Sequence, residues 1–273
     1  MKQRKIIRIV FIIGVVLLVI GLVIRFTSSS NESFDDGKTD HRDEFKIVDS
    51  NYLERYYKRY IAYRKEHSGF SDDTIITHVN IGLDKSDYTD AEKTNENDGI
   101  LMIVNKHNVI IDDYEPKTIM YGDLKVKLVA DMIDDFKNMA AAGKKYDKDI
   151  NIFPVKGYIT YGEQQSTYDI SILEYGEKTL KTVSKPGYSE YQTGLAIDIC
   201  GNSENFKYTK EYSFLKEHAY EYGFILRYPI GKENITGFEF NPYHYRYVGK
   251  DVAKVIHDKD ITFEEYYATY VLK

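Results

Sequence analysis

Histidine and cysteine, which often act at catalytic or metal centres, are few in this chain, with 7 and 1 residues, and alone they define no site. Cys200 is the single cysteine, so no internal disulfide can form and no pattern of metal-binding thiolates exists. A small buried side chain is the simplest role for it. His67, His78, His107 and His257 show no ligand spacing with one another. Chemistry must therefore be sought in longer stretches of sequence.

Four groups of segments carry stronger signals, and they follow one another in a fixed order along the chain. Each includes aromatic, glycine or polar residues at short, defined spacings. The segments are residues 79–84, 101–106 and 113–116; residues 157–168; residues 186–198; and residues 222–229, 236–238 and 241–249. Any one of them would be a weak signal, whereas their common order is a specific one.

These segments resemble the VanY-type D-alanyl-D-alanine carboxypeptidases, which share a zinc-peptidase fold with lysostaphin-type enzymes and the Hedgehog signalling domain. Residues 188–198 are similar to the family segment S-x-H-x-x-G-x-A-x-D. Residues 157–164 are similar to the family's S-G-Y-R-S-Y-x-x-Q from its glycine onward, and residues 241–249 to E-P-W-H-x-R-Y-V-G. The resemblance implies an α+β fold, with one Hedgehog/D,D-peptidase-like domain built from a small antiparallel sheet and flanking helices.

The resemblance also implies an active site, and this chain departs from it. The family site holds zinc through His, Asp and His, with a glutamate as general base and an arginine that stabilises the developing oxyanion. Asp198 and His244 match two metal ligands. Tyr191 stands at the third ligand position, Asn241 at the position of the base and Ile159 at that of the arginine. The catalytic positions are therefore degenerate.

Each replacement removes a chemical function. A phenol with an ordinary pKa near 10 is mostly protonated at neutral pH, so Tyr191 is a poor substitute for imidazole. Asn241 cannot accept a proton from water, and a positioned base is typically worth ~10²–10⁴-fold in rate. Ile159 donates nothing, and one lost oxyanion donor can cost ~10²–10³-fold. Glu239 would lie roughly 7 Å along a strand from the base position, too far to replace it. We expect zinc binding to be weak or absent.

Part of the substrate groove is retained. The resemblance implies that Tyr158, Gln164, Ser189 and Arg246 contact a ligand, which would be a peptidoglycan stem peptide or another D-amino-acid terminus. Intramolecular hydrogen bonding is the alternative for Tyr158 and Ser189. For His244, too, a hydrogen-bonded role in the groove is the alternative to metal binding.

The elements that must position these residues follow from periodicity and turn signals. Helices are predicted at residues 52–67, 124–142, 163–173 and 209–222, and a capping box at Thr262 opens a last short one. Gly143 is expected to end the second of these. Strands are predicted at residues 101–105, 109–111, 152–158, 194–199, 224–228 and 238–248. This mixture indicates one α+β domain over residues 70–273.

The N-terminus predicts attachment to a membrane. Residues 6–24 are apolar apart from Arg8, and this length of helix spans roughly 30 Å of hydrocarbon. Lys2, Arg4 and Lys5 precede the run, which keeps the N-terminus cytoplasmic. A cleaved signal peptide fits less well, because no small-residue cleavage site follows. We therefore expect a cytoplasmic tail (residues 1–5), a single-pass transmembrane anchor (6–25), an extracytoplasmic tether with a stalk helix (26–69) and a domain facing the cell wall. The helix at residues 52–67 suits either a stalk or the first element of the domain, and the second is favoured because an isolated helix this short is marginal in water.

Composition narrows the function classes. The net charge is −6 and the body of the chain carries no basic stripe, which argues against nucleic-acid binding. Three hypotheses remain: a membrane-anchored pseudoenzyme that binds stem peptide, an active zinc D,D-carboxypeptidase with an atypical metal site, and a structural partner of other envelope proteins. Metal content and peptide binding distinguish them.

Overall fold

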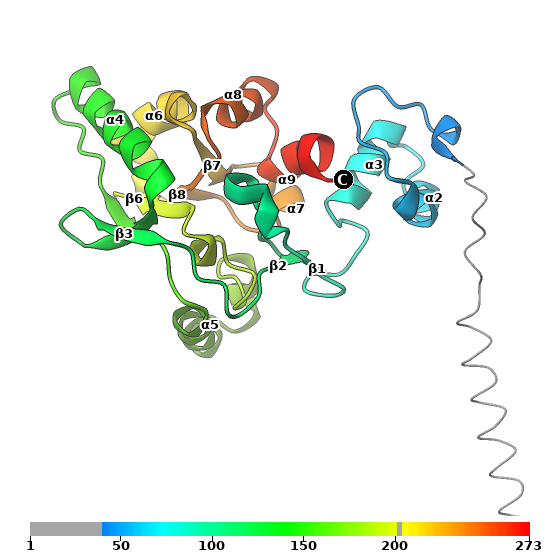
Figure 1. Ribbon diagram of the computed structural model, residues 1–273, viewed down its shortest axis with the longest axis horizontal. Coiled ribbons are helices and arrows are strands. Elements are labelled where there is room, and N and C mark those ends of the chain that lie inside the picture. The colour runs from blue at the N-terminus through cyan, green and yellow to red at the C-terminus, as the bar shows by residue number, and fades with distance from the viewer. Residues whose placement is uncertain (1–39, 201–203) are drawn as a thin grey trace, which may run out of the picture. The chain divides into compact units, whose positions relative to one another are not determined.

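The computed structural model describes residues 40–200 and 204–273 (Figure 1). The predicted cytoplasmic tail and transmembrane anchor lie outside these residues, as do residues 26–39 of the predicted tether. Within the described part of the chain, no helix is both long and apolar enough to cross a membrane. The unit that carries the candidate site extends from Arg42 to Lys273.

A four-stranded antiparallel sheet forms the centre of this unit. Its strand order is β5 (Pro154–Lys156), β6 (Ala196–Ile199), β8 (Asn241–Tyr247) and β7 (Phe224–Tyr228). A separate hairpin pairs β3 (Thr118–Tyr121) with β4 (Val126–Val129), and a short parallel pair joins β1 (Glu92–Lys93) to β2 (Asn108–Val109). The expected α+β class with a small antiparallel sheet is confirmed.

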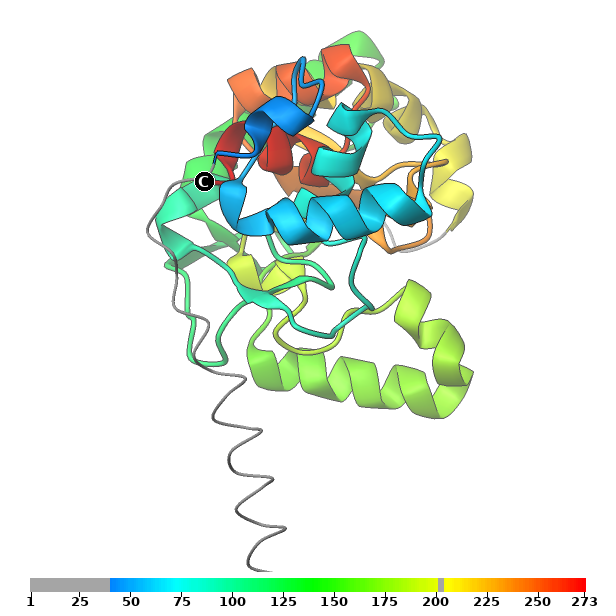
Figure 2. The same ribbon diagram turned by 90° about the vertical axis from the view of Figure 1, so that its right-hand side faces the viewer.

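Helices surround the sheet. The α-helices are α2 (Tyr57–Glu66), α3 (Asp72–Asn80), α4 (Ala130–Tyr146), α5 (Tyr161–Tyr175), α6 (Lys210–His218), α7 (Glu233–Thr236), α8 (Lys250–Lys259) and α9 (Phe263–Tyr266). The 3-10 helix η5 (Glu190–Thr193) precedes β6 and matters for the site. In Figure 1 α4 and α5 lie on opposite sides of the central strands, and Figure 2 shows α5 again at the lower edge of the unit.

Alternation along the strands gives the two sheet faces different roles. One face packs against α4 and α6 in the largest apolar cluster, to which Phe224, Tyr245 and Tyr247 contribute. The opposite face carries the intervening residues, among them Asp198 and His244. The face that carries Asp198 and His244 is therefore supported by an apolar core on the other side of the sheet.

The compact unit begins at Arg42, before residue 70 where the sequence places the start of the domain. Phe45, Tyr52 and Tyr60 pack with residues of α3 in an apolar cluster of their own, and Leu272 also contacts this cluster. The Tyr60 side chain is completely buried, and its hydroxyl donates to Asn80 Oδ1 at 2.6 Å. The helix expected at residues 52–67 is found as α2, and its aromatic face is buried within the compact unit.

Two predicted elements are corrected by long-range pairing. Residues 124–142 do not form one helix, because Val126–Val129 pairs with β3 as strand β4 and α4 begins only at Ala130. Gly143 does not end α4. A Cβ at this position would lie 2.8 Å from Ile152 Cδ1, so the glycine permits close packing while the helix continues to Tyr146.

The apolar run at residues 101–105 is buried but is not a strand. The carbonyl oxygens of Ile100 and Met102 accept hydrogen bonds from Arg246 Nη2 at 3.0 and 2.8 Å, and Thr94 Oγ1 donates to the Ile103 carbonyl at 2.6 Å. Side chains thus satisfy backbone groups that a strand partner would otherwise satisfy. The strand expected at residues 109–111 is reduced to β2. The capping box at Thr262 is confirmed.

Candidate functional site

Sheet register brings the two matched ligand positions together. Asp198 on β6 is paired with His244 on β8, so both side chains leave the same face of the sheet. His244 Nδ1 lies 2.9 Å from Asp198 Oδ1. Both residues are almost fully buried, with 4% and 3% of their surface exposed. The predicted proximity of these residues, 46 positions apart in sequence, is observed.

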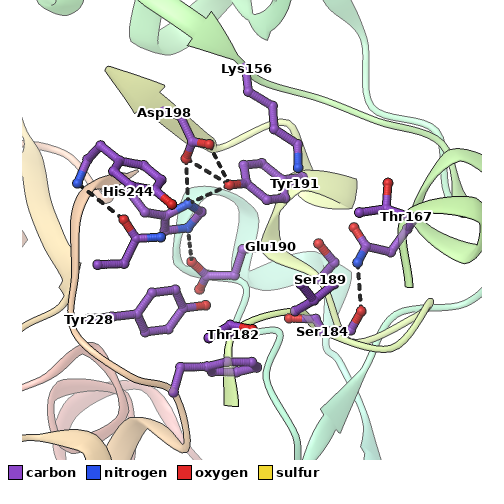
Figure 3. A pocket seen from close by; sticks show the side chains of 15 residues that line it. Lys156, Thr167, Thr182, Ser184, Ser189, Glu190, Tyr191, Asp198, Tyr228 and His244 are labelled. Carbon is purple, nitrogen blue, oxygen red and sulfur yellow. Dashed lines mark hydrogen bonds and ion pairs between the residues drawn. The ribbon is translucent and has the colours of Figure 1, made fainter. Parts of the chain in front are cut away.

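Tyr191 completes this group from the 3-10 helix η5. Gly194 follows the helix with a φ of 72°, and its left-handed conformation turns the chain into β6. The Tyr191 hydroxyl lies 2.7 and 2.8 Å from the two carboxylate oxygens of Asp198 and 3.1 Å from His244 Nδ1 (Figure 3). The phenol oxygen therefore lies against the groups of Asp198 and His244 that face each other.

The electrostatics of the group keep this hydroxyl protonated. Burial, followed by the charge of Asp198, raises the pKa of Tyr191 well above its usual value near 10. Burial alone would lower the pKa of His244, but hydrogen bonds and charge from Asp198 and Glu190 outweigh it and raise that pKa above 6.5. The result is a neutral phenol that donates to a carboxylate, beside an imidazole that readily holds a proton.

A buried ionic cluster holds η5 against strands β7 and β8 of the sheet. Glu190 Oε1 lies 2.8 Å from Arg227 Nε and 3.0 Å from Arg246 Nη1. Arg227 also pairs with Glu264 of α9. Burial acts to raise the pKa of Glu190, but the two arginines and His244 lower it to about 2. Breaking a buried pair by removing one partner is strongly destabilising, so this cluster fixes the residue that precedes Tyr191.

A cavity of about 230 Å³ opens beside these residues, between the sheet, α5 and the segment at residues 182–184. Its wall includes polar groups from all three regions (Figure 3). Gln164 donates from Nε2 to the Ser184 carbonyl at 2.6 Å, while its Oε1 has no partner among the described residues. The cavity is smaller than the ~300–1,000 Å³ typical of drug-sized ligands, so it suits the end of a chain.

The residues expected from the sequence divide into two sets. Those that line the cavity are Gln164, Ser189, Tyr191, Asp198, Asn241 and His244. Tyr158 and Ile159 do not line it, and the Tyr158 amide donates to the Lys127 carbonyl at 2.8 Å. Arg246 is fully buried, and its guanidinium is taken up by Glu190 and by backbone carbonyls. The structure therefore places Arg246 beneath the cavity, where it positions η5.

Two residues of the site were missed by sequence reasoning. Glu190 lies inside the motif between two residues that were singled out, and Lys156 immediately precedes another motif. A signal for Glu190 was available, because Arg227 and Arg246 lie within strands rich in apolar or aromatic residues, and buried charges require partners. No comparable signal marked Lys156, whose side chain enters the cavity only because β5 pairs with β6.

The donor set does not fit zinc. Catalytic zinc takes three protein ligands, and the resemblance would supply them from positions 191, 198 and 244. Tyr191 keeps its proton and donates to Asp198, and this hydrogen bond occupies the carboxylate that would bind the metal. Among residues 40–200 and 204–273, no group of three or more His, Cys, Asp or Glu side chains could hold a metal ion. The site is instead closed by hydrogen bonds among its own residues.

Known proteins with similar sequences point to one family. Residues 125–250 match the model of the VanY D-alanyl-D-alanine carboxypeptidase family. YodJ of Bacillus subtilis (strain 168) is 37% identical over 186 residues, which cover 62% of this chain and 67% of YodJ. A D-alanyl-D-alanine carboxypeptidase of Enterococcus faecalis (strain ATCC 700802 / V583) is 32% identical over 195 residues, covering 66% of this chain and 70% of that protein.

Solved structures agree. The LdcB LD-carboxypeptidase, whose structure addresses peptidoglycan recognition, is 35% identical with a TM-score of 0.60, over 66% of this chain and 91% of that one. VanYB in complex with D-alanine-D-alanine is 31% identical with a TM-score of 0.55, over 62% of this chain and 98% of that one. A VanY D,D-pentapeptidase mutant in complex with Zn(II) is also 31% identical. The chain belongs to the VanY D-alanyl-D-alanine carboxypeptidase family and has its zinc D,D-peptidase fold.

Proposed function

We propose that this protein is a catalytically inactive member of its family, which binds the stem peptide of peptidoglycan or a related D-amino-acid terminus without cutting it. The observation that carries the proposal is the Tyr191 hydroxyl, which lies within hydrogen-bond distance of both Asp198 oxygens and of His244 Nδ1. A neutral phenol in this position satisfies the two residual ligand positions without metal.

The neighbouring replacements support the same conclusion. Asn241 lines the cavity, but its amide cannot accept a proton from water, and its Oδ1 accepts a hydrogen bond from the Tyr243 amide at 3.2 Å. Ile159 points no donor into the cavity. Glu239 is exposed and does not line the cavity. The losses of base and oxyanion donor, worth ~10²–10⁴-fold and ~10²–10³-fold, therefore have no visible replacement.

Binding is supported by what the cavity retains. Ser189 and Gln164 line it with polar atoms while being almost fully buried. The structures of VanYB with D-alanine-D-alanine and of LdcB concern peptidoglycan peptides in folds similar to this one. A groove that keeps its shape and its hydrogen-bonding groups can bind such a peptide after losing the groups that cleave it.

The proposed setting is the outer face of the cell membrane. The apolar run at residues 6–24 and the basic residues before it favour a single-pass anchor with the domain outside. Protease added to intact cells should remove the domain and spare the N-terminus. A domain that remains protected in intact cells would contradict this orientation.

The decisive experiment measures metal and turnover on the full chain purified in mild detergent. We expect well under one equivalent of zinc and no release of D-alanine from stem-peptide analogues, even with zinc added. Tyr191→His should raise zinc affinity because it restores the third ligand, whereas the control Tyr188→His, which alters a tyrosine outside the cavity wall, should not.

Restoring chemistry should require more than the metal. Tyr191→His alone should remain inactive, since Asn241 and Ile159 still lack a base and a donor. The combination of Tyr191→His, Asn241→Glu and Ile159→Arg is the smallest change from which we expect turnover. Stoichiometric zinc in the unmutated protein, or D-alanine release that a chelator abolishes, would instead establish the active carboxypeptidase. Failure to bind any stem peptide would favour a structural role.

A further inference from the structure

The side chain of Lys156 lines the cavity and brings a positive charge into it, although Lys156 was not among the expected active-site residues. It is the only lysine or arginine among the described residues that line the cavity. The alignment of β5 with β6 pairs it with Asp198, so its side chain leaves the sheet on the face that carries the site. Its Nζ lies 3.8 Å from the centre of the Tyr191 ring (Figure 3).

In the part of the chain that the structure describes, the Lys156 ammonium forms no ion pair with a carboxylate. The two lining carboxylates are engaged elsewhere, Glu190 by Arg227 and Arg246, and Asp198 by Tyr191 and His244. Within the described residues, no carboxylate oxygen lies within 4.0 Å of Lys156 Nζ. Burial lowers the pKa of Lys156, and the charge of Asp198 only partly opposes this. A partly desolvated cation without an ion-pair partner is a strong site for an anion.

A second group in the same cavity indicates the rest of the ligand. Gln164 is 2% exposed, and its Nε2 donates to the Ser184 carbonyl, which leaves Oε1 as an acceptor with no partner among the described residues. Among the residues that the structure describes, one small cavity thus holds an acceptor without a donor and a cation without a carboxylate partner, which match an amide N–H close to a negative charge. The end of a peptide with a free carboxylate has both.

We propose that Lys156 binds the terminal carboxylate of the peptide ligand, and that it thereby restores to the cavity a positive charge that neither zinc nor Ile159 provides. The inference rests on the proposed function, because it names the group of the peptide that the cavity selects. It predicts that the protein distinguishes a peptide acid from the corresponding amide.

The test is calorimetric titration of the full chain in mild detergent with two ligands. One is a stem pentapeptide ending in D-Ala-D-Ala, and the other is the same peptide with a C-terminal carboxamide. The unmutated protein should bind the acid more tightly by about tenfold to a hundredfold, the range expected for one hydrogen bond to a charged group. Lys156→Met should abolish this preference and Lys156→Arg should retain most of it.

Lys185→Met is the matched control. The Lys185 ammonium also lies over a tyrosine ring, 4.4 Å from that of Tyr88, but it does not line the cavity. This variant should keep the full preference for the acid. Because the readout is a ratio of affinities within one variant, a general weakening of the fold lowers both affinities and leaves the ratio informative.

The outcomes separate the two proposals. Equal binding of acid and amide by the unmutated protein, or a preference that survives Lys156→Met, overturns the role of Lys156 while the binding function stands. An all-L peptide acid that binds as tightly as the stem peptide, with the same dependence on Lys156, supports the anion site but overturns the proposed ligand. Binding of none of these peptides overturns both.

Discussion

Removing a single oxygen atom tests the central feature of the site. Tyr191→Phe keeps the ring and its packing but deletes the hydroxyl that lies 2.7 and 2.8 Å from the Asp198 oxygens. Asp198 then loses a donor while remaining almost fully buried. Hydrogen bonds to charged groups contribute ~1.5–3 kcal/mol, so we expect the free energy of unfolding to fall by about 2 kcal/mol. For a unit of this size that corresponds to a decrease in Tm of roughly 4–8 °C.

Tyr245→Phe provides the matched comparison. Tyr245 follows His244 on β8 and is completely buried, and its hydroxyl has no hydrogen-bond partner among the described residues. Deleting that hydroxyl should leave stability unchanged or raise it, because an unsatisfied buried polar group is removed. Thermal and urea unfolding of residues 42–273 would measure both variants. A Tyr191→Phe protein as stable as the Tyr245→Phe protein would refute the structural role of the Tyr191 hydroxyl.

Removing metal tests independently whether the stability of this site depends on zinc. If the Tyr191 hydroxyl satisfies Asp198 and His244, the stability of the unmutated unit does not depend on zinc. A chelator should therefore leave its Tm unchanged, and added zinc should not raise it. A decrease of several degrees on chelation would show that a metal stabilises this site.

Three further predictions follow from other parts of the unit. The pKa of Glu190 is lowered to about 2, so its contribution to stability is complete above pH ~4.5 and is lost as pH falls towards 2. The free energy of unfolding of Glu190→Gln should therefore decrease less steeply with falling pH than that of the unmutated protein, and an equal slope would contradict this. Burial raises the pKa of the Cys200 thiol to about 12, so iodoacetamide at pH 8 should modify it far more slowly than free cysteine, and rapid alkylation would count against it. Truncation to residues 70–273 removes Phe45, Tyr52 and Tyr60 from their cluster and should lower Tm by several degrees or more relative to residues 42–273; equal Tm values would restore the later boundary.

Local sequence signals predicted the elements whose ends are set locally. β7 was expected at residues 224–228 and is found at Phe224–Tyr228, and α5 begins at a capping box formed by Thr160 and Glu163. Elements defined by distant partners were predicted less well. Val126–Val129 has an apolar pattern that also suits a helix, and only its pairing with β3 makes it a strand. The helix predicted at residues 52–67 suited either a stalk or the first element of the domain, and only its packing against α3, a later segment, decides between the two.

For the site, the sequence alone determined which chemical groups have been replaced. The identities of Tyr191, Asn241 and Ile159 at their motif positions are read directly from the chain, and so is the retention of Asp198 and His244. These follow from residue type and spacing, because a motif fixes which side chain stands at each position whatever the rest of the fold does.

Only the tertiary structure decided what the replacements do. The Tyr191 hydroxyl meets Asp198 and His244 because η5, β6 and β8 converge, and Lys156 enters the cavity because β5 pairs with β6. Arg246 proved to support η5 from beneath the cavity, since its guanidinium reaches Glu190 across the sheet. Apart from the contact between Tyr191 and Asp198, which are seven positions apart, these contacts join residues far apart in sequence. Their geometry depends on strand register and burial, which no local pattern encodes.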